Sequence, residues 1–304
     1  MKIYEYSLSK KEPTAYRLIA LGFFDGVHEG HRHLLKTAKS LARKKGLVFS
    51  VFTFKAECEA LKSSSRLYQT EEKLELLEKL EADEVILADF NELSSVSAEN
   101  FIKKVLIDGL SCSVAVSGRD FRFGNGAAGD INLLKKMLSE NGADAYIVED
   151  KMSGGEKIST TRIKKLLSEG KVEDANRLLG SPYFIRTTVE SGLGKGKSLG
   201  FPTVNSSLDE KNFPLKRGVY RTAVRVGDKT YPSITNIGVC PTFEERSIHA
   251  ETNIIDFDGN LYGEKIYITF YEYLREEIRF NNEKELISQI KVDINKIKTR
   301  NGDI

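Results

Sequence analysis

Three of the four histidines of the chain lie close together, at His28, His31 and His33. They follow an apolar run, Leu18–Phe24, that stops at Asp25, and they lead into an amphipathic helix. This order places His28 and His31 at the mouth of a strand-to-helix turn of an α/β unit, where ligands usually bind. The free N–H groups of a helix N-terminus suit a phosphate, and neighbouring imidazoles can donate hydrogen bonds to its oxygens as their charge grows. The spacing therefore predicts nucleotide chemistry at this turn.

Other interpretations of the same residues remain open. Two histidines three residues apart could ligate zinc, although no cysteine or further histidine nearby completes a site. The histidines could also be solvated, and we expect this of His33, which we place on the helix surface outside the chemistry. Asp25 could either cap the helix or face the substrate.

The bulk composition is typical of a water-soluble globular protein. The chain has 304 residues, of which 30% are charged and 40% hydrophobic, and its net charge is +2. The balance gives no support to nucleic-acid binding, and no apolar stretch approaches the roughly 20 residues that cross a bilayer. Cys58, Cys112 and Cys240 are widely spaced and look like reduced thiols. We therefore expect a cytoplasmic protein without nucleic-acid or membrane partners, and the sequence leaves the oligomeric state open.

The N-terminal part alternates between short apolar runs and helical periodicity. The predicted strands are Arg17–Phe24, Leu47–Phe54, Glu84–Ala88, Ser113–Ser117 and Ala143–Val148. The predicted helices are His31–Lys45, Glu71–Glu81, Ala98–Asp108, Ile131–Asn141, Thr161–Ser168 and Val172–Leu179. This alternation indicates a doubly wound parallel sheet. Gly180-Ser181-Pro182 breaks the pattern, and we place the domain boundary there, with domains at 1–182 and 183–304.

The C-terminal part is rich in Val, Ile, Thr and Tyr. The predicted strands are Tyr183–Val189, Gly218–Val226, Lys229–Ile237, Glu251–Phe257 and Lys265–Tyr273, with a hairpin at Gly227-Asp228. Short strands with almost no helix between them favour a small β-barrel. The final amphipathic helix, Glu283–Lys298, is expected to pack its apolar stripe on the barrel.

A glycine-rich loop with two lysines, Gly192–Gly200, precedes Pro202-Thr203-Val204-Asn205. It matches neither a P-loop nor a dinucleotide fingerprint, because Ser191 stands where the P-loop glycine belongs and no helix can follow. Such a basic loop can approach phosphates closely, or it can be a plain hairpin loop.

Polar side chains follow this loop at alternating positions of an extended segment. Thr203 and Asn205 point the same way there, and neutral oxygen ligands suit Mg²⁺ shared with nucleotide phosphates, although an ordinary polar strand face would look the same. Glu251, at the start of an apolar strand, could take a proton from an attacking hydroxyl.

Together these stretches resemble the bacterial bifunctional riboflavin kinase/FMN adenylyltransferases, or FAD synthetases, over essentially the whole chain. In the N-terminal part the resemblance lies in Gly22–His31, in Ser117–Gly126 and in Ile158–Ile163. In the C-terminal part it lies in the glycine-rich loop, Pro202–Asn205, Glu251-Thr252 and Leu274–Glu277, with Phe280 ahead of the final helix.

The resemblance implies an N-terminal nucleotidyltransferase domain that transfers AMP from ATP to FMN, releasing pyrophosphate. His28 and His31 would contact the ATP phosphates, and Asp120 would lie near the flavin. The remaining nucleotide-binding residues would be Gly22, Phe24, Asp25, Gly30, Asn125, Ser159, Thr160, Thr161 and Arg162. Ser159 and Thr160 also suit a helix N-cap.

The resemblance also implies a C-terminal riboflavin kinase barrel that uses ATP as its co-substrate. Glu251 would be the base, Thr203 and Asn205 would hold Mg²⁺, and Arg275 and Glu277 would lie near the flavin. The loop residues that would close over the nucleotide are Gly194, Lys195, Gly196, Lys197 and Gly200.

Three positions depart from the family pattern. Phe54–Glu59 lacks the Pro-His-Pro-like segment near the flavin site, Lys164 replaces an arginine, and Asn253 replaces a histidine after Glu251-Thr252. The first departure motivates an alternative, a riboflavin kinase whose N-terminal domain binds ATP but has lost or changed its acceptor. A non-catalytic regulator that responds to flavin is a third hypothesis.

Overall fold

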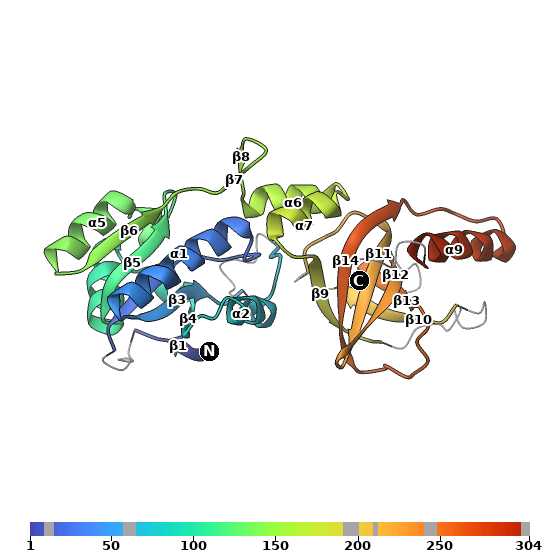
Figure 1. Cartoon of the computed structure of the whole chain (residues 1–304), viewed down its shortest axis with the longest axis horizontal. Helices are drawn as coiled ribbons and strands as arrows, with labels where there is room; N and C mark the ends of the chain where they lie inside the picture. Colours follow the sequence, from blue (N-terminus) through green and yellow to red (C-terminus); the bar gives the residue numbers. More distant parts are fainter. Residues whose placement is uncertain (9–14, 57–64, 191–200, 209–211, 240–247, 299–304) are drawn as a thin grey trace. The chain divides into compact units, whose positions relative to one another are not determined.

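The computed structural model describes residues 1–8, 15–56, 65–190, 201–208, 212–239 and 248–298. Contacts between Cα atoms divide the chain into two compact units, Met1–Thr160 and Thr161–Ile304 (Figure 1). We describe each unit by itself. None of the helices in the described ranges is both long and apolar enough to cross a membrane.

In the described part of the first unit, six strands form one parallel sheet in the order β1-β4-β3-β2-β5-β6. The strands are β1 (Lys2–Tyr6), β2 (Arg17–Leu21), β3 (Val48–Phe54), β4 (Glu84–Ala88), β5 (Cys112–Gly118) and β6 (Asp144–Val148). The helices are α1 (Glu29–Lys45), α2 (Thr70–Glu78), α3 (Phe90–Leu93), α4 (Ala98–Asn100), which a π-helical stretch (Phe101–Gly109) continues, and α5 (Ile131–Glu140). A small hairpin joins β7 (Met152–Ser153) to β8 (Glu156–Lys157). The predicted α/β sheet is confirmed.

The central strand β2 is buried on both faces. Ile19 and Leu21 belong to a core shared with the π-helical stretch and α5, whereas Leu18 and Ala20 alternate to the opposite face, where α1 packs on the sheet. An uninterrupted apolar strand is what a parallel sheet with helices on both sides requires.

The strand order places a topological switch point beside β2. The chain runs outward from β2 to β3 and β4 and then returns to β5 on the other side of β2. The carboxyl ends of β2 and β5 therefore border the crevice where doubly wound proteins bind ligands. His28 follows β2, so the predicted site lies at this crevice.

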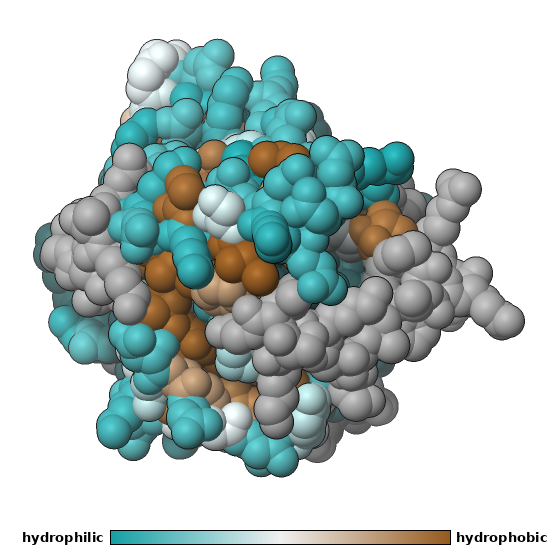
Figure 2. All heavy atoms as spheres, turned by 90° about the vertical axis from the view of Figure 1, so that its right-hand side faces the viewer, coloured by the Kyte–Doolittle hydropathy of each residue, from teal (hydrophilic) through white to brown (hydrophobic). Residues whose placement is uncertain are grey.

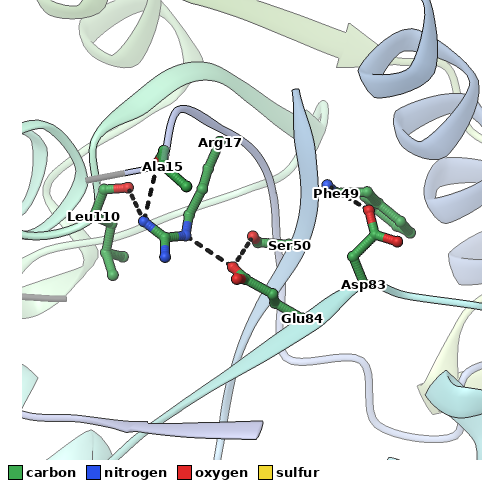
Figure 3. Close-up of polar contacts among 7 residues, drawn as sticks. All are labelled: Ala15, Arg17, Phe49, Ser50, Asp83, Glu84 and Leu110. Atoms are coloured by element: carbon green, nitrogen blue, oxygen red, sulfur yellow. Dashed lines mark hydrogen bonds and ion pairs between the residues drawn. The ribbon is translucent and has the colours of Figure 1, made fainter. Parts of the chain in front are cut away.

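The amino-terminal ends of the inner strands β2 and β4 hold a buried ion pair. Arg17 donates from Nε to Glu84 Oε2 at 2.8 Å, and the hydroxyl of Ser50 donates to the same oxygen at 2.9 Å. The Arg17 guanidinium also donates to the carbonyls of Ala15 and Leu110, both at 3.1 Å. Figure 3 shows Arg17 and Ser50 pointing toward the Glu84 carboxylate. The exposed fractions of the Arg17 and Glu84 side chains are only 1% and 7%.

Replacing one partner of this pair is expected to destabilise the first unit. Glu84→Gln keeps the shape of the side chain but leaves the Arg17 charge buried without its counter-ion, and we expect a loss of about 3–5 kcal/mol. Hydrogen exchange of the β3 and β4 amides in dilute urea measures this loss. Glu78→Gln, at an exposed position of α2, serves as the control. Equal protection in the two variants would contradict the structural role of the pair.

The second unit is built on an antiparallel sheet. Its described strands run in the order β10-β13-β12-β11-β14-β9. They are β9 (Tyr183–Thr188), β10 (Thr203–Leu208), β11 (Gly218–Val226), β12 (Lys229–Val239), β13 (Ile248–Ile254) and β14 (Lys265–Arg275). The hairpin predicted at Gly227 is confirmed, because Val226 pairs with Lys229. The sheet curls until its edges meet, where Glu190 N–H donates to Asn205 O at 2.8 Å. This is the predicted small barrel.

In the described ranges, the barrel is accompanied by the helices α6 (Thr160–Ser168), α7 (Val172–Leu179) and α9 (Glu283–Lys298). Helix α7 packs on β9 and β14, and Asn176 fixes it there. Its side chain donates to Phe270 O at 2.9 Å and accepts from Tyr183 N–H at 2.8 Å. Helix α7 thus belongs to the unit Thr161–Ile304, and the domain boundary at 182/183 stays a prediction.

Helix α9 covers one end of the barrel. Ile297 lies in a buried cluster with Val219, Ile234 and Ile255, and Ile294 packs against it, so the predicted apolar contact of this helix is confirmed. Figure 2 shows hydrophobic residues gathered between hydrophilic ones on this side of the molecule.

One cysteine falls in the described ranges. Cys112 is a buried free thiol whose pKa burial raises to about 12. Cys58 and Cys240 lie outside the described residues.

Candidate active sites

The turn after β2 has a strained backbone. Phe24 and Val27 have φ values of 50° and 41°, a region that side chains with a Cβ rarely adopt, and Gly26 has a φ of 85°. Non-glycine residues hold such a conformation only when their surroundings impose it, and such strain gathers at functional sites.

Two hydrogen bonds to Asp25 hold this turn. Its Oδ1 accepts from Leu67 N–H at 2.9 Å, and its backbone carbonyl accepts from the Thr160 hydroxyl at 3.0 Å. Asp25 is 6% exposed. The structure therefore gives Asp25 a role in shaping the turn, and its predicted contact with the nucleotide stays a prediction.

His28 is the N-cap of α1, and its Nδ1 accepts from His31 N–H at 3.2 Å. Because Nδ1 is the acceptor, the proton of the neutral ring must lie on Nε2. Burial lowers the pKa of His28 to about 4, against the opposing charges of Asp25 and Glu29. His28 is therefore neutral at pH 7 and has one N–H to donate to a ligand.

The ring of His31 stacks on that of His28, with centroids 3.6 Å apart and an interplanar angle of 14°. Burial lowers the pKa of His31 well below its ordinary value, and the neighbouring His28, Lys73 and Lys157 lower it further. The structure thus brings the two histidines together with both rings neutral, and their predicted contacts with the ATP phosphates stay predictions.

Two of the predicted glycines are needed for close packing. A Cβ on Gly30 would approach His28 Cε1 to 3.0 Å and Ile158 O to 3.3 Å. A Cβ on Gly22 would approach the ring of Phe24 to 2.8 Å. Both glycines therefore let the turn fold tightly around the histidine pair.

A lysine that sequence reasoning missed lies close to the histidines. Lys157 forms ion pairs with Asp120 and Asp150, both at 2.8 Å, and these bonds raise its pKa although burial opposes the change. Its charge acts on both histidines. Asp120, predicted near the flavin, is engaged by Lys157 in this structure.

The predicted second loop of the site follows β5, the neighbour of β2. Asn125 N–H donates to Val96 O at 2.7 Å at the start of a short helical turn, Asn125–Ala127. Gly124, with a φ of 75°, lies so close to Ala98 that a Cβ would approach its backbone to 2.6 Å. The backbone of the loop is thus fixed, and the exposed Asn125 side chain is available to a ligand.

The predicted nucleotide-binding residues of the stretch Ile158–Ile163 fall on both sides of the division of the chain after Thr160. Thr160 belongs to the first unit with Ser159, whereas Thr161 and Arg162 belong to the second. The hydroxyl of Thr160 binds the turn, as described above, and the nucleotide contacts of all four residues stay predictions.

A second polar cluster lies on one face of the barrel sheet. In the antiparallel register Asn205 stands opposite Glu251, and Glu251 stands opposite Asn236. Directly opposite residues share a face, and Thr203 lies on it too because it is two residues from Asn205. The intervening Thr252 is buried on the other face. The structure therefore brings Thr203, Asn205 and Glu251 together on one face, and their roles as magnesium ligands and base stay predictions.

Two details of this cluster differ from expectation. Glu251 lies in the middle of β13 rather than at the start of its strand. Asn253, where the family pattern has a histidine, donates from its side chain to Pro202 O at 2.8 Å. It thereby holds the segment that leads into Thr203.

Glu277 lies beside the same cluster. A Cβ on Gly238 would come within 2.2 Å of Glu277 Oε1 and within 3.4 Å of the Asn236 amide nitrogen. Gly238 therefore makes room for Glu277 next to Asn236, the neighbour of Glu251.

Arg275, predicted near the flavin, anchors α9. It donates from Nε and Nη2 to Asp293 Oδ2, at 3.0 and 2.8 Å, and Asp293 is 1% exposed. This buried pair gives Arg275 a structural role, and its flavin contact stays a prediction. Five predicted loop residues lie outside the described residues: Gly194, Lys195, Gly196, Lys197 and Gly200.

The donor chemistry of the second cluster fits magnesium. The Thr203 hydroxyl and the Asn205 amide carbonyl are neutral oxygen ligands beside the carboxylate of Glu251, and hard oxygen donors suit Mg²⁺ held jointly with phosphates. Across the described ranges, no three His, Cys, Asp or Glu residues converge as a metal site of their own.

Comparison with known proteins identifies the class of this chain. A family model described as FAD synthetase matches residues 10–162, and one described as riboflavin kinase matches residues 179–300. The two units thus carry the two modules of flavin-nucleotide synthesis.

Individual relatives narrow this class to one family. The bifunctional riboflavin kinase/FMN adenylyltransferase of Bacillus subtilis (strain 168) is 36% identical over 292 residues, covering 93% of this chain and 92% of that protein. That of Escherichia coli (strain K12) is 35% identical over 282 residues, covering 91% and 90%. The chain belongs to the family of bifunctional riboflavin kinase/FMN adenylyltransferases.

One solved structure matches almost the whole chain. A crystal structure described as a macrolide-efflux protein from Streptococcus pneumoniae has a TM-score of 0.89 and 26% identity, and covers 98% of this chain and 99% of that chain.

Proposed function

We propose that the chain makes FMN and FAD in two successive reactions, one in each unit. The second unit transfers the γ-phosphate of ATP to riboflavin, and the first unit transfers AMP from a second ATP to the resulting FMN. Two observations together carry the proposal. The structure brings together the His28–His31 pair in the first unit and the polar cluster of Thr203, Asn205 and Glu251 in the second. Both family models match the chain.

In the kinase reaction, Glu251 accepts the proton of the riboflavin 5′-hydroxyl while that oxygen attacks the γ-phosphorus of ATP. The bond to the bridging oxygen breaks, and ADP leaves. Glu251 can do this because it stands on the open face of β13 beside the two oxygen ligands. Thr203 and Asn205 would hold Mg²⁺, which supplies positive charge to the transferred phosphate.

In the adenylyl transfer, an oxygen of the FMN phosphate attacks the α-phosphorus of ATP, and pyrophosphate leaves. No protein nucleophile is needed, so the site works by positioning and by charge stabilisation. The Nε2–H of His28 is placed to donate to a phosphate oxygen, and the neighbouring Lys157 adds positive charge.

The alternative of a kinase with a lost adenylyl acceptor is not favoured. The FAD synthetase model matches the first unit, and the histidine pair is assembled there with both rings neutral. Of the departing segment Phe54–Glu59, residues 57–59 lie outside the described residues, and in the described part Ala56 N–H donates to the Thr70 hydroxyl at 2.9 Å. Both reactions consume ATP, a cytoplasmic metabolite, and we propose that the protein acts in the cytoplasm.

Two separate incubations test the proposal. Purified protein with riboflavin, ATP and Mg²⁺ is expected to form FMN, and protein with FMN, ATP and Mg²⁺ is expected to form FAD and an equal amount of pyrophosphate. Flavins are resolved by chromatography. FMN formation in the first incubation with no FAD in the second would support the kinase-only alternative instead.

A further inference from the structure

A buried lysine lies next to the turn that carries His28 and His31, and the mechanism of adenylyl transfer given above does not use it. Lys73 sits in the first turn of α2 and is 2% exposed. A buried ammonium costs free energy unless it is well hydrogen-bonded, so its placement calls for an explanation.

The hydrogen bonds of Lys73 join the ends of two strands. Its Nζ donates to Phe54 O at 2.6 Å, at the end of β3, and to Phe23 O at 3.4 Å, just beyond the end of β2. The Thr53 hydroxyl lies 3.4 Å from Nζ and donates to the same Phe23 carbonyl at 2.8 Å. Lys73 therefore links the carboxyl ends of both strands at the start of the strained turn that carries the histidines.

Lys73 also places a positive charge near the start of the turn. Its Nζ lies 5.2 Å from the ring centroid of Phe23, and the Arg66 guanidinium lies 4.4 Å from the same centroid. After burial and the neighbouring His28, Lys73 also contributes to lowering the pKa of His31. A fixed cation at this place favours the arrival of two polyanionic substrates, ATP and FMN.

We propose that Lys73 is a positioning residue for adenylyl transfer: its ammonium fixes the start of the turn that carries His28 and supplies a fixed positive charge at the carboxyl ends of β2 and β3. The inference rests on the proposed function of the first unit. It assigns a role in the reaction to a residue that need not contact either substrate.

Lys73→Met tests the proposal, because methionine keeps an unbranched stem and removes the charge and the donor. We expect the kcat for FAD formation from FMN to fall about tenfold to a hundredfold, since small displacements of a positioned group cost this much. Riboflavin phosphorylation by the same preparation is expected to be unchanged and serves as an internal control. Lys79→Met, at the exposed end of the same helix, is the matched control and should leave both reactions unchanged.

Rescue by a conservative variant distinguishes a charge effect from a packing effect. Lys73→Met removes both the charge and the hydrogen-bond donor, whereas Lys73→Arg keeps the charge and alters the hydrogen bonds to Phe54 O and Phe23 O. FAD formation is therefore expected to stay low in Lys73→Met and to recover a large part of the wild-type kcat in Lys73→Arg.

The outcomes separate the possibilities. A lower kcat for FAD formation in Lys73→Met, with partial recovery in Lys73→Arg and unchanged riboflavin phosphorylation, supports the proposal. A wild-type rate in Lys73→Met, or an equal loss in Lys73→Met and Lys73→Arg, would overturn it. If Lys73→Met fails to fold, Lys73→Gln, which keeps a donor and removes the charge, takes its place in the same comparison. Failure of the wild-type protein to make FAD would instead refute the proposed function.

Discussion

Glu251→Gln is expected to reduce the rate of riboflavin phosphorylation by about 10²–10⁴-fold, the usual contribution of a general base. Glutamine has nearly the same shape but cannot take the proton of the attacking hydroxyl. The register that puts Glu251 opposite Asn205 and Asn236 should persist, because it is fixed by backbone pairing. FAD formation from supplied FMN should continue at the wild-type rate.

The measurement is the initial rate of each reaction at saturating ATP. Glu264→Gln provides the control, since this glutamate is exposed in the same unit and lies outside the polar cluster. A Glu251→Gln enzyme that phosphorylates riboflavin normally would show that Glu251 is not the base. Loss of both reactions in folded protein would show that the two sites are not independent.

Removing the His28 ring is expected to lower the rate of FAD formation strongly and to leave riboflavin phosphorylation unchanged. His28→Ala removes the Nε2–H donor to the phosphate, and removing one such donor costs about 10²–10³-fold in kcat. It also removes the N-cap acceptor of α1, which should cost about 1 kcal/mol of stability.

His28→Asn separates these two effects. Asparagine is a good N-cap, so this variant should regain most of the lost stability, but its shorter side chain cannot place a donor where Nε2 lies. FAD formation should therefore stay low in both variants while riboflavin phosphorylation is unchanged. His33→Ala, on the exposed part of α1, is the control. Recovery of FAD formation in His28→Asn would assign His28 a capping role and no role in the reaction.

The sequence predicted the elements whose patterns are local. Buried strands such as β2 and β4 are uninterrupted apolar runs, and the histidine turn is marked by the break at Asp25. The edge strand β1 was missed: KIYEY alternates as a half-buried strand would, but it is only five residues long and mostly exposed, so its pattern is weak. It is a strand only because it pairs with β4.

Contacts between distant residues were harder to predict. That Thr203 and Asn205 share a face follows from local alternation, but their meeting with Glu251 depends on the pairing of β10 with β13, which the sequence does not specify. Lys73 belongs to a charged helical segment, where a lysine normally faces solvent, so nothing marks it as buried. The pairing of Arg275 with Asp293 likewise depends on how α9 docks.

The origin of each phosphate in the products tests the two-reaction account most directly. Two parallel time courses start from riboflavin and Mg²⁺, one with ATP labelled at the α-phosphate and one with ATP labelled at the γ-phosphate. The account predicts that the γ-label appears first in FMN and then in FAD, and that the α-label appears in FAD alone, after a lag. If the γ-label accumulates in FMN while no flavin ever carries the α-label, the first unit does not transfer AMP to FMN and the central claim is wrong.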